Sequence, residues 1–441
     1  MIKITDKKLC SGCGACASIC PQKCINIIHD QEGFRYPKVE EDKCIKCGLC
    51  IKVCPIINVR ENKNNPLSVC GAVNKNFSIL KSSSSGGVFT ELAKYILSSG
   101  GVVFGATYDK DVNVIHSFIE KEEDIYKMRG SKYAESNTNE VYIKVKEFLN
   151  SGRLVLFSGT PCQIAGLKFF LGKDFENLIT CDFICLGVPS NKIYNAYKSY
   201  YERKYSSKVT NIEFRNKKDG WVHFNMVFHF ENDKKKYILR YMNPYILTFY
   251  KAYSVRPSCY KCKFRGLNSG SDIKLADFWR ARESKQPSYN FYGVSHVFIN
   301  TKKGERIFEK IKDNFDLTNS DYEEALQLNG SLSSIRTDIK ERDKFMKKIS
   351  SLQDEEIVEE MKNLCSQNVI EKAGKKLELK CQKLSIKNKL FVLCKRYLYK
   401  INLVSILVTP DLFYFLRTNF YFLIKLKEGV LNAKLCLTDL N

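Results

Sequence analysis

Histidine and long apolar runs are scarce in this chain of 441 residues. All five His residues occupy apolar or strand-like settings, which favours structural roles, and we assign none of them to catalysis. They are His29, His116, His223, His229 and His296. The most apolar stretch, residues 401–424, is interrupted by Pro410 and Asp411 and falls short of the ~18 unbroken apolar residues of a membrane span. We expect it to pack as a helical cap, with contact to a membrane surface as the alternative.

Acidic residues are also few, since 48 Asp and Glu stand against 71 Lys and Arg and the formal net charge is +23. Lys is spread along the chain and no nucleic-acid recognition motif accompanies it, so we expect a solvated Lys-rich surface and no nucleic-acid binding. Attraction to an acidic electron-donor protein or to anionic lipid is the alternative. The tail, residues 371–441, holds 14 Lys and Arg against 5 Asp and Glu, which would suit a weak membrane-surface contact.

Cysteine, in contrast, is abundant, with 19 residues. The first residues, MIKITDKKLC, are charged and show no export signal, so we expect a cytoplasmic location. In a reducing cytoplasm, Cys residues serve as metal ligands or buried thiols rather than as a disulfide framework. Ten of them fall within residues 10–70, five within 162–262 and four within 365–436.

The first of these zones contains an internal repeat. CSGCGACASICP begins at Cys10 and CIKCGLCIKVCP begins at Cys44, and both follow the pattern C-x2-C-x2-C-x3-C-P. This spacing is typical of ferredoxins with two 4Fe-4S clusters, in which the fourth Cys of each run ligates the other cluster. It predicts one cluster on Cys10, Cys13, Cys16 and Cys54, and a second on Cys44, Cys47, Cys50 and Cys20. Zinc is the less favoured alternative, because the whole pattern occurs twice with its proline.

Residues 68–190 alternate between strand-like and helix-like segments. Strands are predicted at 68–75, 101–109, 153–159 and 178–187, and helices after the loop at 82–87 and over 140–152 and 160–172. This alternation is typical of an α/β domain with a mainly parallel sheet. Further along, residues 210–230 predict two strands around a turn at 217–220, and residues 341–364 predict a charged helix.

Two loops of this domain have the composition of anion-binding sites. Residues 82–87, SSSSGG, precede a helix, whose N-terminal N–H groups and partial positive charge attract phosphate. Residues 128–136, MRGSKYAES, place Arg129 and Lys132 beside Gly130. Each loop alone is also consistent with an ordinary helix cap or a solvated turn. Together, beside an iron–sulfur module, they predict a flavin site, because a flavin exchanges electron pairs with substrates and single electrons with clusters.

Seven segments, in order, resemble the coenzyme F420 hydrogenase/dehydrogenase beta-subunit family. They are LKSSSSGGVFTELA, MRGSKYAES, LFSGTPCQIAGLK, CDFICLGVPS, FRNKKDGW, RPSCYKCKF and SGSDIKLADFW. The resemblance implies an iron–sulfur flavoprotein that binds FAD and acts on a small molecule, either F420-like or a metabolite of polysaccharide synthesis. It implies cofactor contacts from Ser84, Ser85, Gly86, Gly87, Arg129, Gly130, Ser131, Lys132, Tyr133, Thr160, Gln163 and Asp277.

The resemblance also implies a third 4Fe-4S cluster, held by Cys162, Cys185, Cys259 and Cys262. Cys162 and Cys185 each follow an apolar strand, at the sheet edge where sites of α/β domains gather. A helix N-terminus stabilises a thiolate, which suits Cys162 as a ligand. A catalytic thiol at Cys162 and a zinc site are the alternatives. The remaining Cys residues lack ligand spacing and are expected to be inert: Cys24, Cys70, Cys181, Cys365, Cys381, Cys394 and Cys436.

The sequence thus predicts three domains: a two-cluster ferredoxin domain at 1–66, an α/β flavin and iron–sulfur domain at 67–345, and a basic helical extension at 346–441. For the α/β domain we expect a mixed, largely parallel sheet. The expected function is an oxidoreductase that passes electrons between the clusters, FAD and a small-molecule substrate. The alternative is an electron-transfer subunit without a substrate site, which docks to a catalytic partner. In either case a redox partner protein, such as a ferredoxin-type donor, is expected.

Overall fold

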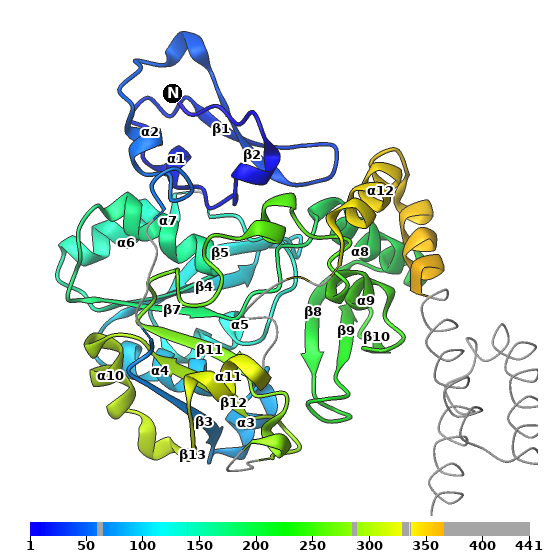
Figure 1. The fold of residues 1–441 in the computed structure, drawn as a ribbon. Helices are drawn as coiled ribbons and strands as arrows, with labels where there is room; N and C mark the ends of the chain where they lie inside the picture. The colour runs from blue at the N-terminus through cyan, green and yellow to red at the C-terminus, as the bar shows by residue number, and fades with distance from the viewer. Residues whose placement is uncertain (60–64, 139, 285–288, 329–334, 336, 366–441) are drawn as a thin grey trace, which may run out of the picture. The chain divides into compact units, whose positions relative to one another are not determined.

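The computed structural model describes residues 1–59, 65–138, 140–284, 289–328, 335 and 337–365 (Figure 1). The chain divides into two units, Met1–Leu364 and Cys365–Asn441, and the description below concerns the first. The apolar stretch at 401–424 and Cys381, Cys394 and Cys436 lie outside the described residues. Among the helices that are described, none is long and apolar enough to cross a membrane.

The N-terminal module consists of a two-stranded hairpin and two short helices. Strands β1 (Ile25–His29) and β2 (Arg35–Val39) pair in antiparallel fashion. Helices α1 (Ala15–Ser18) and α2 (Leu49–Lys52) each lie within one of the two Cys runs. Gly14 and Gly48 precede these helices with φ of 81° and 76°, a conformation that costs glycine little and other residues more. The repeat in the sequence is therefore a repeat in backbone conformation.

A large mixed sheet forms the centre of the following domain. Its strands are β3 (Ser68–Asn74), β4 (Val102–Tyr108), β5 (Val114–Ile119), β6 (Val155–Ser158), β7 (Leu178–Phe183), β11 (Ile273–Asp277), β12 (Ser295–Ile299) and β13 (Phe315–Ser320). Among the described residues, their order is β13-β3-β12-β11-β7-β6-β4-β5. The pairs β4–β6, β6–β7 and β7–β11 are parallel.

The sheet is mixed, as predicted, but it is not largely parallel. Four of its seven described pairings are antiparallel, at the two sides of the parallel centre. The alternation of strands and helices in the sequence detects only strands joined by helical crossovers, which parallel pairing requires. Strand β5 follows β4 through a short turn, with no helix between them. Strands β12 and β13 lie beyond residues 68–190, over which the alternation was read, so the alternation did not reveal these three strands.

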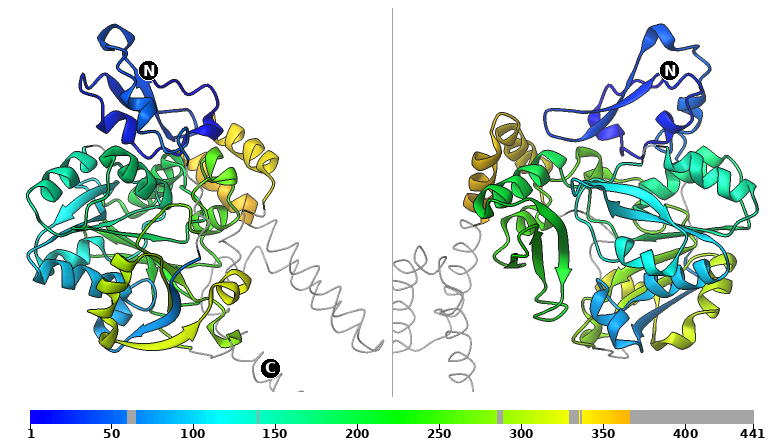
Figure 2. Two further views of the ribbon diagram at one scale, coloured as in Figure 1. Left: turned by 60° about the vertical axis from the view of Figure 1, so that its left-hand side comes forward. Right: turned by 180° about the vertical axis from the view of Figure 1, so that it is seen from behind.

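Helices cover both faces of the sheet. The helices are α3 (Phe77–Ser82), α4 (Val88–Ser98), α5 (Ile125–Met128), α6 (Val141–Asn150), α7 (Pro161–Leu171), α10 (Lys302–Glu309) and α11 (Tyr322–Leu328). Leu92 and Ile96 of α4 pack with Phe308 of α10 in one buried cluster. On the other face, Val145 of α6 and Leu167 of α7 belong to a second cluster, which also includes Cys13 of the N-terminal module. The module therefore packs on α6 and α7 (Figures 1 and 2).

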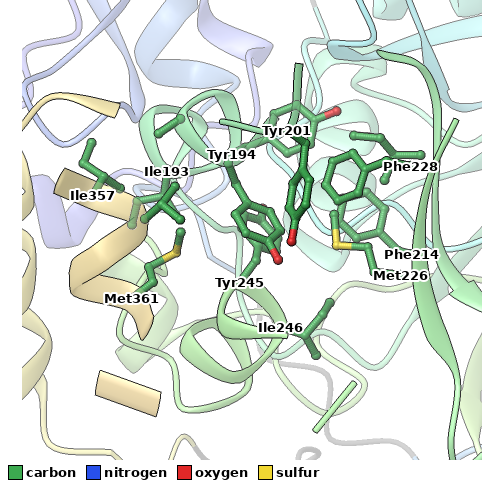
Figure 3. Packing of buried hydrophobic residues seen from close by; sticks show 14 of the residues in the cluster. Ile193, Tyr194, Tyr201, Phe214, Met226, Phe228, Tyr245, Ile246, Ile357 and Met361 are labelled. Atoms are coloured by element: carbon green, nitrogen blue, oxygen red, sulfur yellow. The ribbon is translucent and has the colours of Figure 1, made fainter. Parts of the chain in front are cut away.

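A smaller antiparallel sheet and several helices surround an aromatic core (Figure 3). These elements are α8 (Asn191–Tyr205), β8 (Val209–Asn216), β9 (Asn225–Phe230), β10 (Lys235–Leu239), α9 (Pro244–Tyr250) and α12 (Ile339–Ser350). Residues 354–365 form a further helix, which contributes Ile357 and Met361 to this core.

Two distant parts of the chain contribute to the aromatic core. Phe34, from the hairpin of the N-terminal module, is fully buried in it. Phe345 and Met346 of α12 are also buried there, so the predicted domain boundary at 345/346 falls inside a packed helix. Arg342 of α12 donates to Glu32 of the hairpin through Nη1 at 2.9 Å and also through Nη2. The N-terminal module and α12 are thus joined directly.

Candidate functional site

The C-terminal ends of three neighbouring parallel strands border a cavity of about 570 Å³. Strand β6 ends at Ser158, β7 at Phe183 and β11 at Asp277, and all three residues line it. This is the edge at which open α/β sheets bind ligands. The volume of the cavity falls within the roughly 300–1,000 Å³ that is typical of small-molecule sites.

The structure brings the two predicted anion-binding loops together at this cavity. Ser131 N–H donates to Ser84 Oγ at 2.7 Å, and the two hydroxyl oxygens lie 3.0 Å apart. Arg129 Nη1 donates to Ser82 Oγ at 2.8 Å. Gly130 has a φ of 89° and open space where a Cβ would lie. Segments 47 residues apart in sequence thus form one polar wall.

Eleven of the twelve predicted cofactor contacts line the cavity. Gly86 is the exception, because it packs against the large sheet, where an added Cβ would lie 2.0 Å from the Ala72 carbonyl oxygen. Two of the eleven also have a structural role. Gln163 Oε1 accepts from Thr160 N–H at 2.9 Å, and the two residues form the capping box of α7.

Burial governs the charge of two cavity-lining bases. It lowers the pKa of Lys132 to about 7, and Lys132 Nζ lies 3.4 Å from the Arg129 carbonyl oxygen. Burial also lowers the pKa of His116 to about 4, so this imidazole is neutral near pH 7. Lys132 is therefore a cavity-lining group whose charge changes near neutral pH.

We predict that anion binding in the cavity depends on pH through Lys132. An anion beside the ammonium favours its charged form, so binding takes up a proton and weakens as pH rises above about 7. The affinity of the apoprotein for FAD, measured by quenching of flavin fluorescence, should fall between about pH 6 and 9. In Lys132→Met the profile should flatten. Burial also lowers the pKa of Lys217 to about 7, but Lys217 does not line the cavity and is present in both proteins. Equal profiles in the two proteins would contradict the assignment.

The four Cys residues predicted to hold the third cluster meet beside the cavity. Cys162 lies in the first turn of α7, Cys185 follows β7, and Cys259 and Cys262 belong to or follow a short 3-10 helix (Pro257–Lys261). All four line one small hollow. Cys259 Sγ accepts from Val188 N–H at 3.4 Å, the kind of contact that also stabilises cluster-bound sulfur. Within the described residues, no group of three or more ligating side chains is arranged to hold a single metal ion.

Burial acts on Cys162 against the expected effect of the helix N-terminus. Burial, followed by the charge of Cys262, raises the pKa of Cys162 to about 12, so in the free chain burial dominates. Thr160 Oγ1, 3.2 Å from the sulfur, opposes this rise only in part. Burial likewise raises the pKa of Cys259 to about 11. A nucleophilic Cys requires the opposite shift, which disfavours the catalytic-thiol alternative.

In the N-terminal module, the Cys residues group as the crossed pattern predicts. Burial raises the pKa of Cys16 to about 12, and the next contributions come from Cys10 and Cys54. The fourth Cys of the second run therefore lies beside the first run. Cys20, Cys44, Cys47 and Cys50 line a separate small hollow together with Cys24. Cys24 is 2% exposed, and its sulfur lies 3.4 Å from that of Cys20.

A buried ion pair connects the module to the α/β domain. Arg256 Nη2 donates to Glu135 Oε1 at 2.6 Å and to the Arg35 carbonyl oxygen at 2.7 Å. Its Nη1 donates to the Cys10 carbonyl oxygen at 3.3 Å. Burial would lower the pKa of Arg256, but Glu135 holds it above its ordinary range. This guanidinium joins the first Cys run to the segment that carries Cys259.

The first Cys run also lies against α7. Tyr142 OH donates to the Cys13 carbonyl oxygen at 2.8 Å and Thr138 Oγ1 donates to it at 3.0 Å. A Cβ added to Gly166 of α7 would lie 3.0 Å from Cys13 Sγ, so a glycine suits this close approach. The charge of Cys162 contributes to the raised pKa of Cys13, because the two are neighbours. The predicted ligands of the first and third clusters are therefore adjacent.

Several further cavity-lining residues were not predicted as site residues, and His116, Arg215, Arg240 and Trp279 are among them. Arg215 and Trp279 lie within FRNKKDGW and SGSDIKLADFW, so the family resemblance contained a signal for them. No local pattern indicates His116 or Arg240, because each lies in or next to an ordinary strand. Their place in the cavity follows from sheet pairing alone.

Three domain models match the sequence. The 4Fe-4S dicluster domain matches residues 9–57. The coenzyme F420 hydrogenase/dehydrogenase beta subunit N-terminal model matches residues 69–142, and the C-terminal model matches residues 152–325. No curated protein matches the chain. The chain is similar to one in the xenon-derivatised F420-reducing NiFe hydrogenase complex from Methanosarcina barkeri, with 18% identity, a TM-score of 0.37, and coverage of 71% of this chain and 95% of that chain.

The dicluster module and the α/β domain define an iron–sulfur electron-transfer protein. The chain belongs to the coenzyme F420 hydrogenase/dehydrogenase beta-subunit family, whose two models together match more than half of it. The predicted family and the 4Fe-4S clusters of the N-terminal module are thereby confirmed. The family name also connects the chain to oxidoreductases.

Proposed function

We propose that this chain is an iron–sulfur flavoprotein oxidoreductase that binds FAD in the cavity and a third 4Fe-4S cluster at Cys162, Cys185, Cys259 and Cys262. A bound flavin supplies the exchange of electron pairs with a small molecule and of single electrons with clusters. One observation carries the proposal. The cavity is lined at once by Gly12 of the first Cys run, by Cys162 and Cys185, and by the two anion-binding loops.

The residues present suit a flavin pyrophosphate. Helix α4 begins after Gly87 without a side-chain cap, so its first N–H groups are available as donors. Ser84, on the loop before α4, and Ser131 and Arg129, on the facing loop, add further donors. Glu91, in the first turn of α4, accepts from Asn74 Nδ2 at 2.9 Å and from Asn314 Nδ2 at 3.1 Å, which engages its carboxylate elsewhere. These groups would hold the phosphates and orient the cofactor.

The test is cofactor release. Protein purified without oxygen, then denatured and analysed by chromatography, should release about one FAD per chain if one cavity holds one cofactor. Wild-type iron content should be about twelve atoms per chain, because each cubane contains four. Absence of flavin even after reconstitution would overturn the proposal.

A second candidate function is electron transfer to a catalytic partner, without a substrate site. It is supported by Cys47, a predicted ligand of the second cluster, which is exposed. The neighbouring residue Ile45 is 60% exposed, and Lys46 adds positive charge beside it. Such a surface suits a redox partner with acidic groups. Turnover of a small molecule by the purified chain favours the first function, and activity only after addition of a partner favours the second.

A further inference from the structure

One wall of the cavity contains two guanidinium groups that share the same aromatic neighbours. Arg215 lies 5.1 Å from the ring centre of Phe224 and 5.0 Å from that of Trp279. Arg240 lies 5.1 Å and 5.5 Å from the same two rings. Arg215 is the next-to-last residue of β8 and Arg240 follows β10, so both come from the smaller antiparallel sheet. This wall is built by different elements from the loops proposed for the flavin phosphates.

Only one of the two arginines in this wall is paired with a carboxylate that the structure describes. Asp277 Oδ2 accepts from Arg215 Nη1 at 2.6 Å. Arg240 donates through Nη1 to the Val222 carbonyl oxygen at 2.9 Å, and among the described residues no carboxylate lies within ion-pair distance of it. The other two acidic residues of the cavity wall, Glu135 and Asp182, are paired with Arg256 and Lys274. One positive charge therefore remains at the aromatic wall.

Arg215, although paired with Asp277, lacks hydrogen-bond partners in the described part of the chain for two of its nitrogen atoms. Its side chain is 3% exposed, and its Nε and Nη2 are buried without a partner. Among the described residues that line the cavity, it alone has such unpartnered atoms. Nε and Nη2 form one edge of the guanidinium, which can donate two parallel hydrogen bonds to a carboxylate or phosphate. A buried charged donor without a partner is unfavourable, and an acidic group would relieve this cost.

We propose that Arg240 and the unpartnered Nε–Nη2 edge of Arg215 bind the acidic group, carboxylate or phosphate, of a planar small-molecule substrate. Trp279 and Tyr250, which line the same wall, offer aromatic faces to the rest of that molecule. The assignment to a substrate, rather than to the cofactor's own phosphates, rests on the proposed flavin site. The existence of an anion site does not depend on it.

Benzoate and its uncharged analogue benzamide test the site, because they share a ring and differ in charge. Calorimetric titration of the full chain should show benzoate binding about tenfold or more tighter than benzamide, the effect of a charge-assisted pair of hydrogen bonds. Arg240→Met should remove this preference. Arg240→Lys, which keeps the charge but not the planar fork, should retain part of it. Arg153→Met, a change at a surface ion pair with Glu120, is the control and should bind as wild type does.

The outcomes separate the two possible sources of the acidic group. Loss of benzoate preference in Arg240→Met with unchanged FAD content supports the substrate site. Loss of FAD from Arg240→Met, with FAD retained in Arg153→Met, would overturn it, because the wall would then hold the cofactor's phosphate. Equal binding of benzoate and benzamide by wild type, or binding of neither, would also overturn it. A wild-type chain without flavin would refute the proposed function alone, since the titration needs no flavin.

Discussion

Cys162→Ala should slow flavin reduction greatly while leaving the N-terminal clusters in place. The eight Cys residues of the two runs are unchanged, so about eight iron atoms should remain of about twelve. Cys162 neighbours Cys13 on one side and lines the cavity on the other. Its loss therefore interrupts the path between module and cavity. Stopped-flow absorbance with a ferredoxin-type donor should show fast bleaching of the remaining clusters and slow flavin reduction.

Cys70→Ala is the matched control for this experiment. Cys70 lies in β3, and burial raises its pKa to about 12, as for Cys162, but it does not line the cavity or the hollow shared by the four Cys residues. This variant should keep its iron and its rate of flavin reduction. If Cys162→Ala behaves in the same way as this control, Cys162 is a buried thiol and not a ligand.

Arg256→Met should destabilise the contact between the N-terminal module and the α/β domain. The change leaves Glu135, with a side chain 6% exposed, as an unpaired buried charge. Removal of one partner from a buried pair typically costs about 3–5 kcal/mol. Both the thermal unfolding midpoint and the retention of iron at moderate temperature should fall, because the arginine also supports the Cys10 carbonyl.

The double variant Arg256→Met/Glu135→Gln distinguishes a charge effect from a packing effect. Glutamine has nearly the same shape as glutamate and leaves no unpaired charge, so the double variant should recover much of the lost stability. Arg256 also packs on the ring of Tyr36 at 4.6 Å, and the methionine side chain retains part of that contact. A double variant as unstable as Arg256→Met would show that the hydrogen bonds to the Cys10 and Arg35 carbonyls, not the charge, dominate.

The sequence predicted most of what has a local signature. The Cys spacing predicted the crossed grouping in which Cys54 lies beside Cys10 and Cys16. Apolar runs predicted β6 and β7, two of the three strands that border the cavity, but not β11. The family motifs pointed to loops that do lie side by side at Ser84 and Ser131. Each Cys run and each single strand or helix is encoded within fewer than about twenty residues, which is why a single sequence shows them.

Features that depend on distant pairing were not predicted. The pairing of β3 with β13 and the bridge from Arg256 to Cys10 join segments far apart in the sequence. The guanidinium pair at Arg215 and Arg240 depends on the packing of the smaller sheet, which no local pattern reports. The effect of burial on the pKa of Cys162 was not predicted for a related reason. Burial is the sum of many remote neighbours, and here it outweighs the local effect of the helix terminus.

The ion pair between Glu32 and Arg342 has a consequence for the order of events during synthesis. The two residues are 310 positions apart, so at about 5–20 residues per second the arginine leaves the ribosome roughly 15 to 60 s after the glutamate. During that interval the hairpin of the N-terminal module has neither this partner nor the aromatic core completed by α12. Newly made N-terminal segments would therefore be open to oxygen and proteases for tens of seconds. Cluster insertion before release of the chain should be less protected than insertion after it.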